Sequence, residues 1–135
     1  MSLSLIKGAL ENKVISIIPN INTNYEGVNP NTPVSGVPYQ SLYFMPATNE
    51  GSYINDKAYL ARGIFQISLF YPFGVGTKDI MERVNLYLNA FAIGTQLVNQ
   101  GVTVSISDTP DVVRIGQSGD RYVIHISIPF KSLIG

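Results

Sequence analysis

The chain has 135 residues with nine basic and nine acidic side chains, so its net charge is zero and charged residues reach only 13%, about half the usual share. A hydrophobic share of 45% excludes a disordered chain, and the lack of a basic cluster excludes a protein that binds nucleic acid by counterion release. No apolar run is long enough for a membrane span, and the N-terminus lacks the pattern of a signal peptide.

Residues 3–18 are predicted to form an amphipathic helix. The apolar residues follow steps of three and four, which is the spacing of one helical face. They are Leu3, Ile6, Leu10, Val14 and Ile17. Pro19 is expected to end the helix, because the residue before a proline is disfavoured in the α region.

Residues 19–49, called the excursion from here on, form the most unusual stretch of the chain. The excursion holds five prolines and many asparagines, which are typical of turns, and its one charged residue is Glu26. Residues 39–45 within it are expected to form a strand. A loop of this length is usually functional or disordered. Because disordered segments are normally charged, we interpret the excursion as a structured segment that contacts a neighbouring molecule.

The middle of the chain predicts a strand, a turn and a helix. Residues 59–71 are expected to form a long strand with one apolar and one mixed face. The turn at 73–76 has two glycines but lacks the rest of a phosphate-binding loop. Residues 77–93 are expected to form the second amphipathic helix, with Thr77 as its cap and Gly94 as its stop.

The last third of the chain is rich in strands. Residues 102–106, 112–117 and 121–130 are predicted strands, and a turn joins the last two as a hairpin. Pro129 is expected at a strand end or an edge, because it cannot donate to a ladder. The predicted fold is an α+β two-layer domain over residues 1–135, with a mostly antiparallel sheet of four to five strands and two amphipathic helices packed on one face.

No group of side chains indicates catalysis. The chain has no cysteine, which removes a thiolate nucleophile, disulfides and thiolate zinc sites. The single histidine, His125, lies within a predicted strand of alternating residues. No serine stands in the Gly-x-Ser-x-Gly motif that forms a nucleophile elbow. The acidic pair Asp108 and Asp111 suits a turn, and Asp79 and Glu82 suit the start of a helix. We therefore expect no catalytic residue, no metal and no cofactor.

The order of these features resembles one protein family. An N-terminal helix and an Asn/Pro-rich stretch are followed by short motifs with glycines, and a helix comes after the last motif. The motifs are Gly36-Val37-Pro38-Tyr39, Gly63-Ile64-Phe65-Gln66-Ile67 and Pro72-Phe73-Gly74-Val75-Gly76. Over nearly its whole length the chain resembles the small tail terminator, or tail completion, proteins of bacteriophages and prophages.

This resemblance implies a structural phage tail protein and not an enzyme. Members of the family assemble as a ring, typically a hexamer, that caps the tail tube, ends its polymerisation and contacts the head–tail connector. The expected partners are therefore copies of the chain itself, the tail tube protein and the connector, without sequence-specific nucleic acid, membrane or cofactor. The expected location is the virion tail, with assembly in the bacterial cytoplasm.

Interface residues are expected in the excursion and in two turns. Tyr25, Tyr39 and Tyr43 are candidate aromatic anchors of the contact between subunits; alternatively, these rings fill the core of the domain. The candidates for contacts with the tube or connector are Phe73, Val75, Asp108 and Asp111. Two alternative functions stay open at this point: another virion subunit, such as a tail tube or head–tail joining protein, and a small-molecule binding module that uses the mixed face of the sheet.

Overall fold

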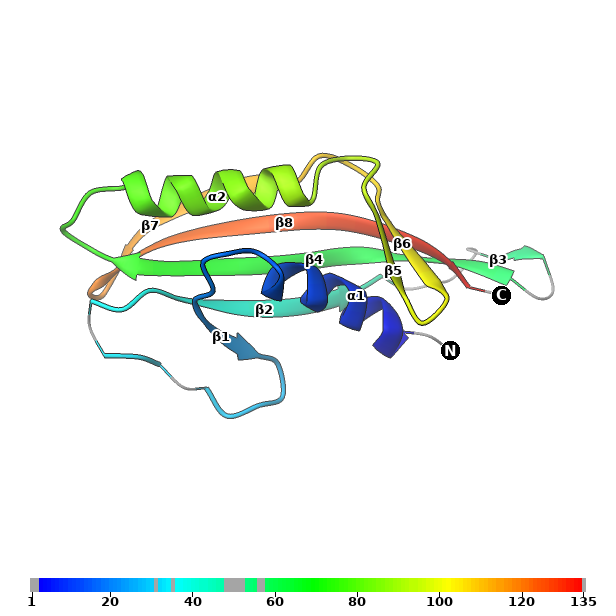
Figure 1. Cartoon of the computed structure of the whole chain (residues 1–135), viewed down its shortest axis with the longest axis horizontal. Coiled ribbons are helices and arrows are strands. Elements are labelled where there is room, and N and C mark those ends of the chain that lie inside the picture. The colour runs from blue at the N-terminus through cyan, green and yellow to red at the C-terminus, as the bar shows by residue number, and fades with distance from the viewer. Residues whose placement is uncertain (1–2, 31, 35, 48–52, 56–57, 135) are drawn as a thin grey trace.

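The computed structural model describes residues 3–30, 32–34, 36–47, 53–55 and 58–134, and Figure 1 shows its arrangement. The helices are α1 (Leu3–Ile15) and α2 (Lys78–Ala90). The strands are β1 (Asn22–Tyr25), β2 (Tyr39–Pro46), β3 (Tyr53–Asn55), β4 (Ala58–Pro72), β5 (Gln96–Asn99), β6 (Val102–Ile106), β7 (Asp111–Ser118) and β8 (Arg121–Ile134). The predicted α+β class is confirmed.

The strands form one eight-stranded sheet in the order β1-β2-β4-β8-β6-β5, with β3 on β4 and β7 on β8. β1 runs parallel to β2, and the other described pairs are antiparallel. The prediction of four to five strands in a mostly antiparallel sheet is therefore wrong in the number of strands, and the sheet is mixed. β1, β3 and β5 have only three or four residues each, too few for an alternating pattern to reveal them.

The centre of the sheet is the long antiparallel pair of β4 and β8, which runs from Tyr59 opposite Ile134 to Pro72 opposite Arg121. The length of β8 leaves room for two partners on its other edge. β7 pairs with the first half of β8, and β6 pairs with it near Phe130. β8 therefore carries both of the predicted strands that precede it, β7 and β6, on one edge.

Pro129 lies inside β8, opposite Ile64, and not at a strand end or an outer edge as predicted. Its carbonyl accepts a hydrogen bond from the backbone N–H of Ser107 at 3.1 Å. Since the nitrogen and carbonyl of one residue point to the same side of an antiparallel strand, the proline nitrogen also points away from β4. That side falls between the paired stretches of β7 and β6, so the missing N–H interrupts no ladder.

Both helices pack on one face of the sheet, as predicted (Figure 1). Buried side chains of α1, α2 with its C-cap residue, β4 and β8 form one continuous core. Among them are Ile6, Leu10, Val14, Phe65, Ile67, Leu69, Ile80, Val84, Tyr87, Phe91, Ile124, Ile126, Ile128 and Phe130. On both long strands the alternating apolar residues point to the helices, so the periodicity of the sequence identifies the core face correctly.

The helix ends differ from the prediction. The first helix stops at Ile15, and the second stops at Ala90 with Phe91 as its C-cap residue. Gly94, expected as the stop, lies beyond the cap in a left-handed conformation with φ of 86°. Thr77 stands at the N-cap, but its side chain makes no capping hydrogen bond. Periodicity therefore places both helices and overestimates their length.

Candidate assembly surfaces

Two buried arginines hold the excursion to the body of the domain. Arg83 in α2 is 3% exposed, and Arg121 at the start of β8 is 5% exposed. In the described part of the chain only one ion pair reaches either guanidinium, between Arg121 Nε and the exposed carboxylate of Asp120 at 3.8 Å. A buried charge needs hydrogen bonds to offset its desolvation, and both arginines find them on backbone carbonyls of the excursion.

Arg83 ties the start of the excursion to α2. Its Nη1 donates to the carbonyl of Pro19, and its Nε and Nη2 donate to the hydroxyl of Tyr87 at 3.1 and 2.8 Å. That hydroxyl donates in turn to Oε1 of Gln40, whose amide nitrogen donates to the hydroxyl of Thr23 at 2.9 Å. Burial raises the pKa of Tyr87, so the hydroxyl keeps the proton that it donates. One network therefore links α2, β2 and β1.

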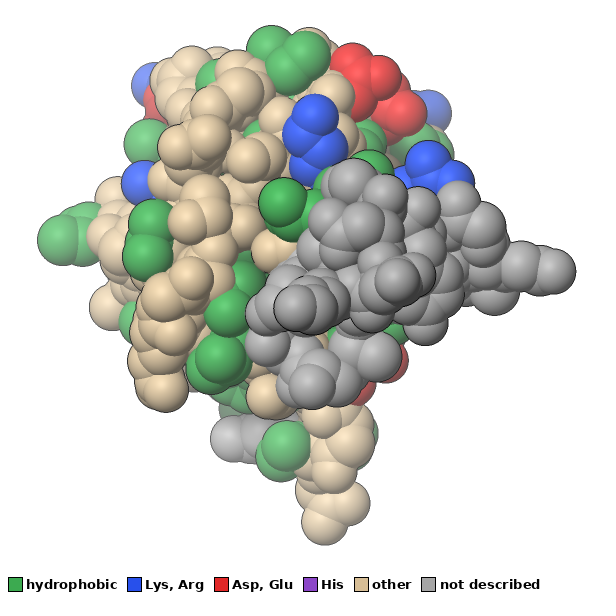
Figure 2. Space-filling model, turned by 90° about the vertical axis from the view of Figure 1, so that its right-hand side faces the viewer, with side chains coloured by type: hydrophobic (Ala, Val, Ile, Leu, Met, Phe, Trp, Pro, Cys, Tyr) green, Lys and Arg blue, Asp and Glu red, His purple; other side chains and the backbone are tan. Residues whose placement is uncertain are grey.

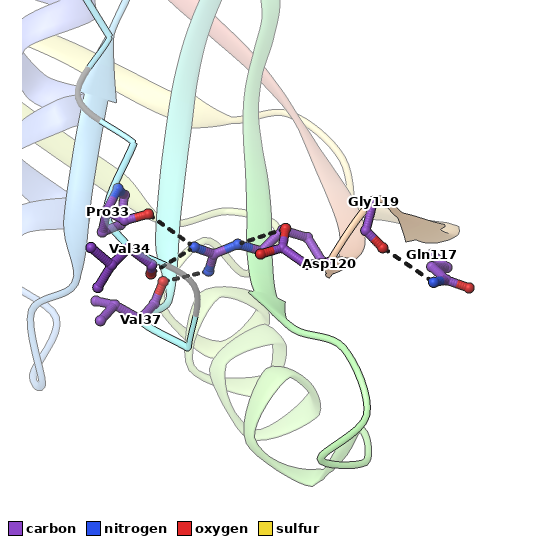
Figure 3. Close-up of polar contacts among 7 residues, drawn as sticks. Pro33, Val34, Val37, Gln117, Gly119 and Asp120 are labelled. Carbon is purple, nitrogen blue, oxygen red and sulfur yellow. Dashed lines mark hydrogen bonds and ion pairs between the residues drawn. The ribbon is translucent and has the colours of Figure 1, made fainter.

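Arg121 holds the middle of the excursion (Figure 3). Its Nη1 donates to the carbonyl of Val37, and its Nη2 donates to the carbonyls of Val34 at 3.1 Å and Pro33 at 3.3 Å. Hydrogen bonds from a charged donor are stronger than neutral ones. One side chain at the start of β8 therefore fixes the backbone of a segment more than 80 residues earlier in the chain.

The one charged residue of the excursion, Glu26, also makes a hydrogen bond to the backbone. Oε1 of Glu26 accepts a hydrogen bond from the backbone N–H of Phe44 at 2.5 Å. Together with the two arginines, this contact fixes the excursion at its start, middle and end. Within the described residues the excursion is therefore structured, as the sequence predicts. A segment that is already ordered loses little conformational entropy when it binds a partner.

The three tyrosines predicted as anchors differ in how far they are open to a partner. The ring of Tyr39 stacks on Phe70 with 4.5 Å between ring centres, and the guanidinium of Arg121 lies 4.9 Å from the centre of the tyrosine ring. Tyr25 packs against the core, and burial raises its pKa. Tyr43 is 37% exposed, so it is the ring best placed to meet a neighbouring molecule.

Tyr43 lies on the face of the sheet that carries no helix. Beside it is a hollow of about 370 Å³ that is open to solvent. The residues that line it are Glu26, Tyr43, Met45, Gln66, Ser68, Phe70 and His125. Nδ1 of His125 is buried and has no hydrogen-bond partner in the part of the chain that the structure describes. Burial also lowers the pKa of His125, which favours the neutral imidazole at pH 7.

The turn residues predicted to meet other tail proteins form two separate surfaces. Phe73 and Val75 are 49% and 71% exposed in the β4–α2 connection. Asp108 in the β6–β7 connection and Asp111 at the start of β7 are exposed. Oδ1 of Asp108 accepts a hydrogen bond from the backbone N–H of the next residue at 2.8 Å. In Figure 1 the first connection lies at the far left and the second at the top, so the four residues do not form one continuous surface for a partner.

The described surface shows no concentrated charge and no group of metal ligands. Figure 2 views the end of the molecule where the C-terminus lies, and charged side chains are scattered on this face without a patch of one sign. Among the described residues, no three acidic, histidine or cysteine side chains group closely enough to hold a metal. Neither described helix is long and apolar enough to cross a membrane.

Comparison with known proteins gives one family and one fold. A family model described as phage tail terminator protein matches residues 5–130. A solved structure that carries only a sequence identifier as its name is similar with a TM-score of 0.77 and 20% identity, over 98% of this chain and 96% of that chain. At this identity the likeness shows a shared fold. No curated protein matches the chain.

Proposed function

The chain belongs to the phage tail terminator protein family, and on this premise we propose that it forms a ring that caps the tail tube, ends tube polymerisation and joins the tail to the head connector. Membership makes it a structural protein of the phage tail. The proposal adds that it acts without catalysis and assembles in the bacterial cytoplasm. Its partners are further copies of itself, with six as the number that the resemblance implies, the tube protein and the connector.

The observation that carries the proposal is the ordered, nearly uncharged excursion. A ring closes when two different patches of one subunit meet head to tail and the rotation repeats. A specific contact of this kind buries about 800 Å² per partner around a centre poor in charge. The excursion brings one charge, Glu26, whose carboxylate is already bonded to the backbone N–H of Phe44. Burial of the excursion against a neighbouring subunit therefore leaves few charges without partners.

Tyr43 is the proposed aromatic anchor of this contact, because its ring is the most open of the three. In the proposal Tyr25 and Tyr39 contribute the parts of their rings that the core and Arg121 leave uncovered. The exposed turn at residues 73–76 and the β6–β7 connection are the proposed contacts with the tube and the connector.

The first experiment measures the mass of the purified chain by multi-angle light scattering and images the same sample by negative-stain microscopy, alone and with polymerising tube subunits of the same phage. We expect discrete rings, free or at one end of each tube, and tubes that stop growing when the protein is added. Filaments of the chain itself would indicate a tube subunit. A monomer that leaves tube growth unchanged would overturn the proposal.

A matched pair of variants tests the anchor. Met81 lies on α2 and is 43% exposed, close to the 37% of Tyr43. Replacing Tyr43 by alanine should weaken self-association at least about tenfold, which is the effect of a modest hot spot. The Met81→Ala control should change it less than about twofold, which is near neutral. Equal effects in sedimentation velocity would remove the proposed role of Tyr43.

A further inference from the structure

We propose that each contact in the ring joins the exposed valines of one excursion to the apolar edge strand β7 of the next copy. The inference rests on the proposed ring and names the two patches that meet. The first patch consists of Val28, Val34 and Val37. The second is the outer edge of β7 with Val112, Val113 and Ile115, where Val112 lies on the face of the sheet that carries the helices and Val113 lies on the opposite face.

The edge of β7 is open in the described part of the chain. β7 pairs with β8 alone, and no described residue bonds to the backbone of its other edge. Its three apolar side chains are between 42% and 49% exposed. Natural edge strands are usually protected by charges, prolines or bulges. β7 has one bulge near Gly116 and only one charged residue in its interior, Arg114. Its edge is therefore weakly protected and leaves an apolar surface that another molecule can bind.

The excursion offers a fixed apolar surface of similar kind. Val28, Val34 and Val37 are 62%, 75% and 37% exposed. Arg121 binds the carbonyls of the last two, so their backbone is held while their side chains face solvent (Figure 3). Apolar side chains on a fixed backbone can pack against a partner with little loss of entropy.

The positions of the two patches favour a second copy of the chain as the occupant. The excursion contains β1 and β2, which lie on one side of the β4–β8 pair, and β7 pairs with β8 on the other side. Figure 3 shows the same separation, with Val34 and Val37 on one side of the strands and Gln117 and Gly119 on the other. One molecule cannot bring these patches together. A head-to-tail neighbour can, and its own free patches repeat the contact.

Charge agrees with this pairing. The excursion has one charge, Glu26, and the interior of β7 has one, Arg114. Arg114 is exposed, and its Nε donates to the hydroxyl of Tyr122 at 2.9 Å. The excursion and the interior of β7 therefore contribute one charge each, and these charges are opposite in sign. Asp111 stands at the start of β7, away from the interior of the strand. Opposite charges at the rim of an apolar contact fix its register.

The absence of native cysteine allows a direct test by disulfide trapping. Val34→Cys and Val113→Cys are introduced into separate chains, which are mixed, assembled with tubes where needed, and oxidised. We expect a cross-linked dimer at least ten times more abundant than in a mixture of Val34→Cys with Val98→Cys. Val98 is the control because it is 70% exposed on β5, outside both patches. The double variant Val34→Cys/Val113→Cys should give a ladder that ends at the ring size.

Aspartate variants test the same geometry without a covalent bond. Val34→Asp disables the first patch and leaves β7 intact, and Val113→Asp does the reverse. Each variant alone should stay a monomer under conditions where the parent assembles, whereas an equal mixture should stop at dimers. Circular dichroism confirms that each variant is folded, as expected for exposed positions.

Two outcomes would overturn the inference and leave the ring standing. Val113→Cys chains that cross-link mainly with each other would show a two-fold contact. Rings that assemble with no trapping above the Val98→Cys control would show that other surfaces meet. If neither the parent chain nor any variant forms an oligomer, even with tubes present, the proposed function and the inference both fail.

Discussion

Replacement of Tyr87 by phenylalanine removes one oxygen atom from the most buried polar network of the domain. The side chain is 0% exposed, and phenylalanine has nearly the same shape, so the ring keeps its place in the core. The lost hydroxyl accepts two hydrogen bonds from Arg83 and donates one to Gln40. Arg83 and Gln40 are themselves 3% and 2% exposed, so water cannot readily take the place of the hydroxyl.

The size of the effect follows from these contacts. A hydrogen bond to a charged group contributes about 1.5–3 kcal/mol, and a buried donor left without an acceptor adds its desolvation. Arg83 keeps its bond to Pro19, and the two bonds to one hydroxyl are not additive. We therefore expect the free energy of unfolding to fall by about 3 kcal/mol. For a chain of this length the melting temperature should fall by about 10 °C.

The assay is urea unfolding followed by circular dichroism, at several protein concentrations because self-association stabilises the folded chain. The matched control is Tyr122→Phe. The hydroxyl of Tyr122 also accepts a hydrogen bond from an arginine, Arg114 at 2.9 Å, but this pair is exposed, so its loss should cost less than about 1 kcal/mol. If both variants lose the same free energy within about 0.5 kcal/mol, which is the margin of additivity, the argument from burial is refuted.

Three further predictions concern other parts of the domain. Burial lowers the pKa of His125 below its usual 6.5, so on acidification the imidazole is protonated in the unfolded chain before it is protonated in the folded one. Stability therefore falls as the pH drops below about 6.5. In His125→Gln, the urea midpoints measured between pH 7.5 and 5 should depend less on pH than in the parent. A Cβ at Gly63 would lie 2.4 Å from a backbone oxygen of β2, so Gly63→Ala should lower the free energy of unfolding by about 2–3 kcal/mol through overpacking. The control Gly74→Ala has open space around its Cβ and should lower it by only about 1 kcal/mol because of the positive φ at this position. Similar melting temperatures for the two variants would contradict this prediction. Arg121→Met should release the middle of the excursion, so that protease cleaves near residues 33–37 at least tenfold faster than in the parent. An unchanged cleavage rate would show that other contacts hold the segment.

The long periodic elements could be predicted from the sequence because burial imposes their spacing. In β8 the alternation that begins at Tyr122 identifies the core face, and in α2 the steps from Ile80 to Val84 identify the buried stripe. The edges of the sheet could not be predicted in the same way. β1 and β5 have only four residues each, too few to show a period, even though β5 pairs with the strand that directly follows it, β6.

The buried arginines could not be predicted from residue type, because arginine is usually exposed. A weak signal exists for Arg83, which falls on the same helical stripe as Ile80 and Tyr87. No comparable signal exists for Arg121, since its partners are backbone carbonyls and carry no sequence pattern. For the same reason the order of the excursion was predicted from its missing charge, while the side chains that create this order emerged only from the structure.

The unbroken pairing of β4 with β8 has a mechanical consequence. The pair holds 14 opposed positions, which at about 3.4 Å per residue gives a length of about 45 Å. Tension applied at opposite ends of the two strands loads their hydrogen bonds in shear, so that many must break together. The β5–β6 hairpin has only four opposed positions, and a pull across its open end separates them one at a time. The domain therefore resists tension along its long axis through its centre and yields first at its margin.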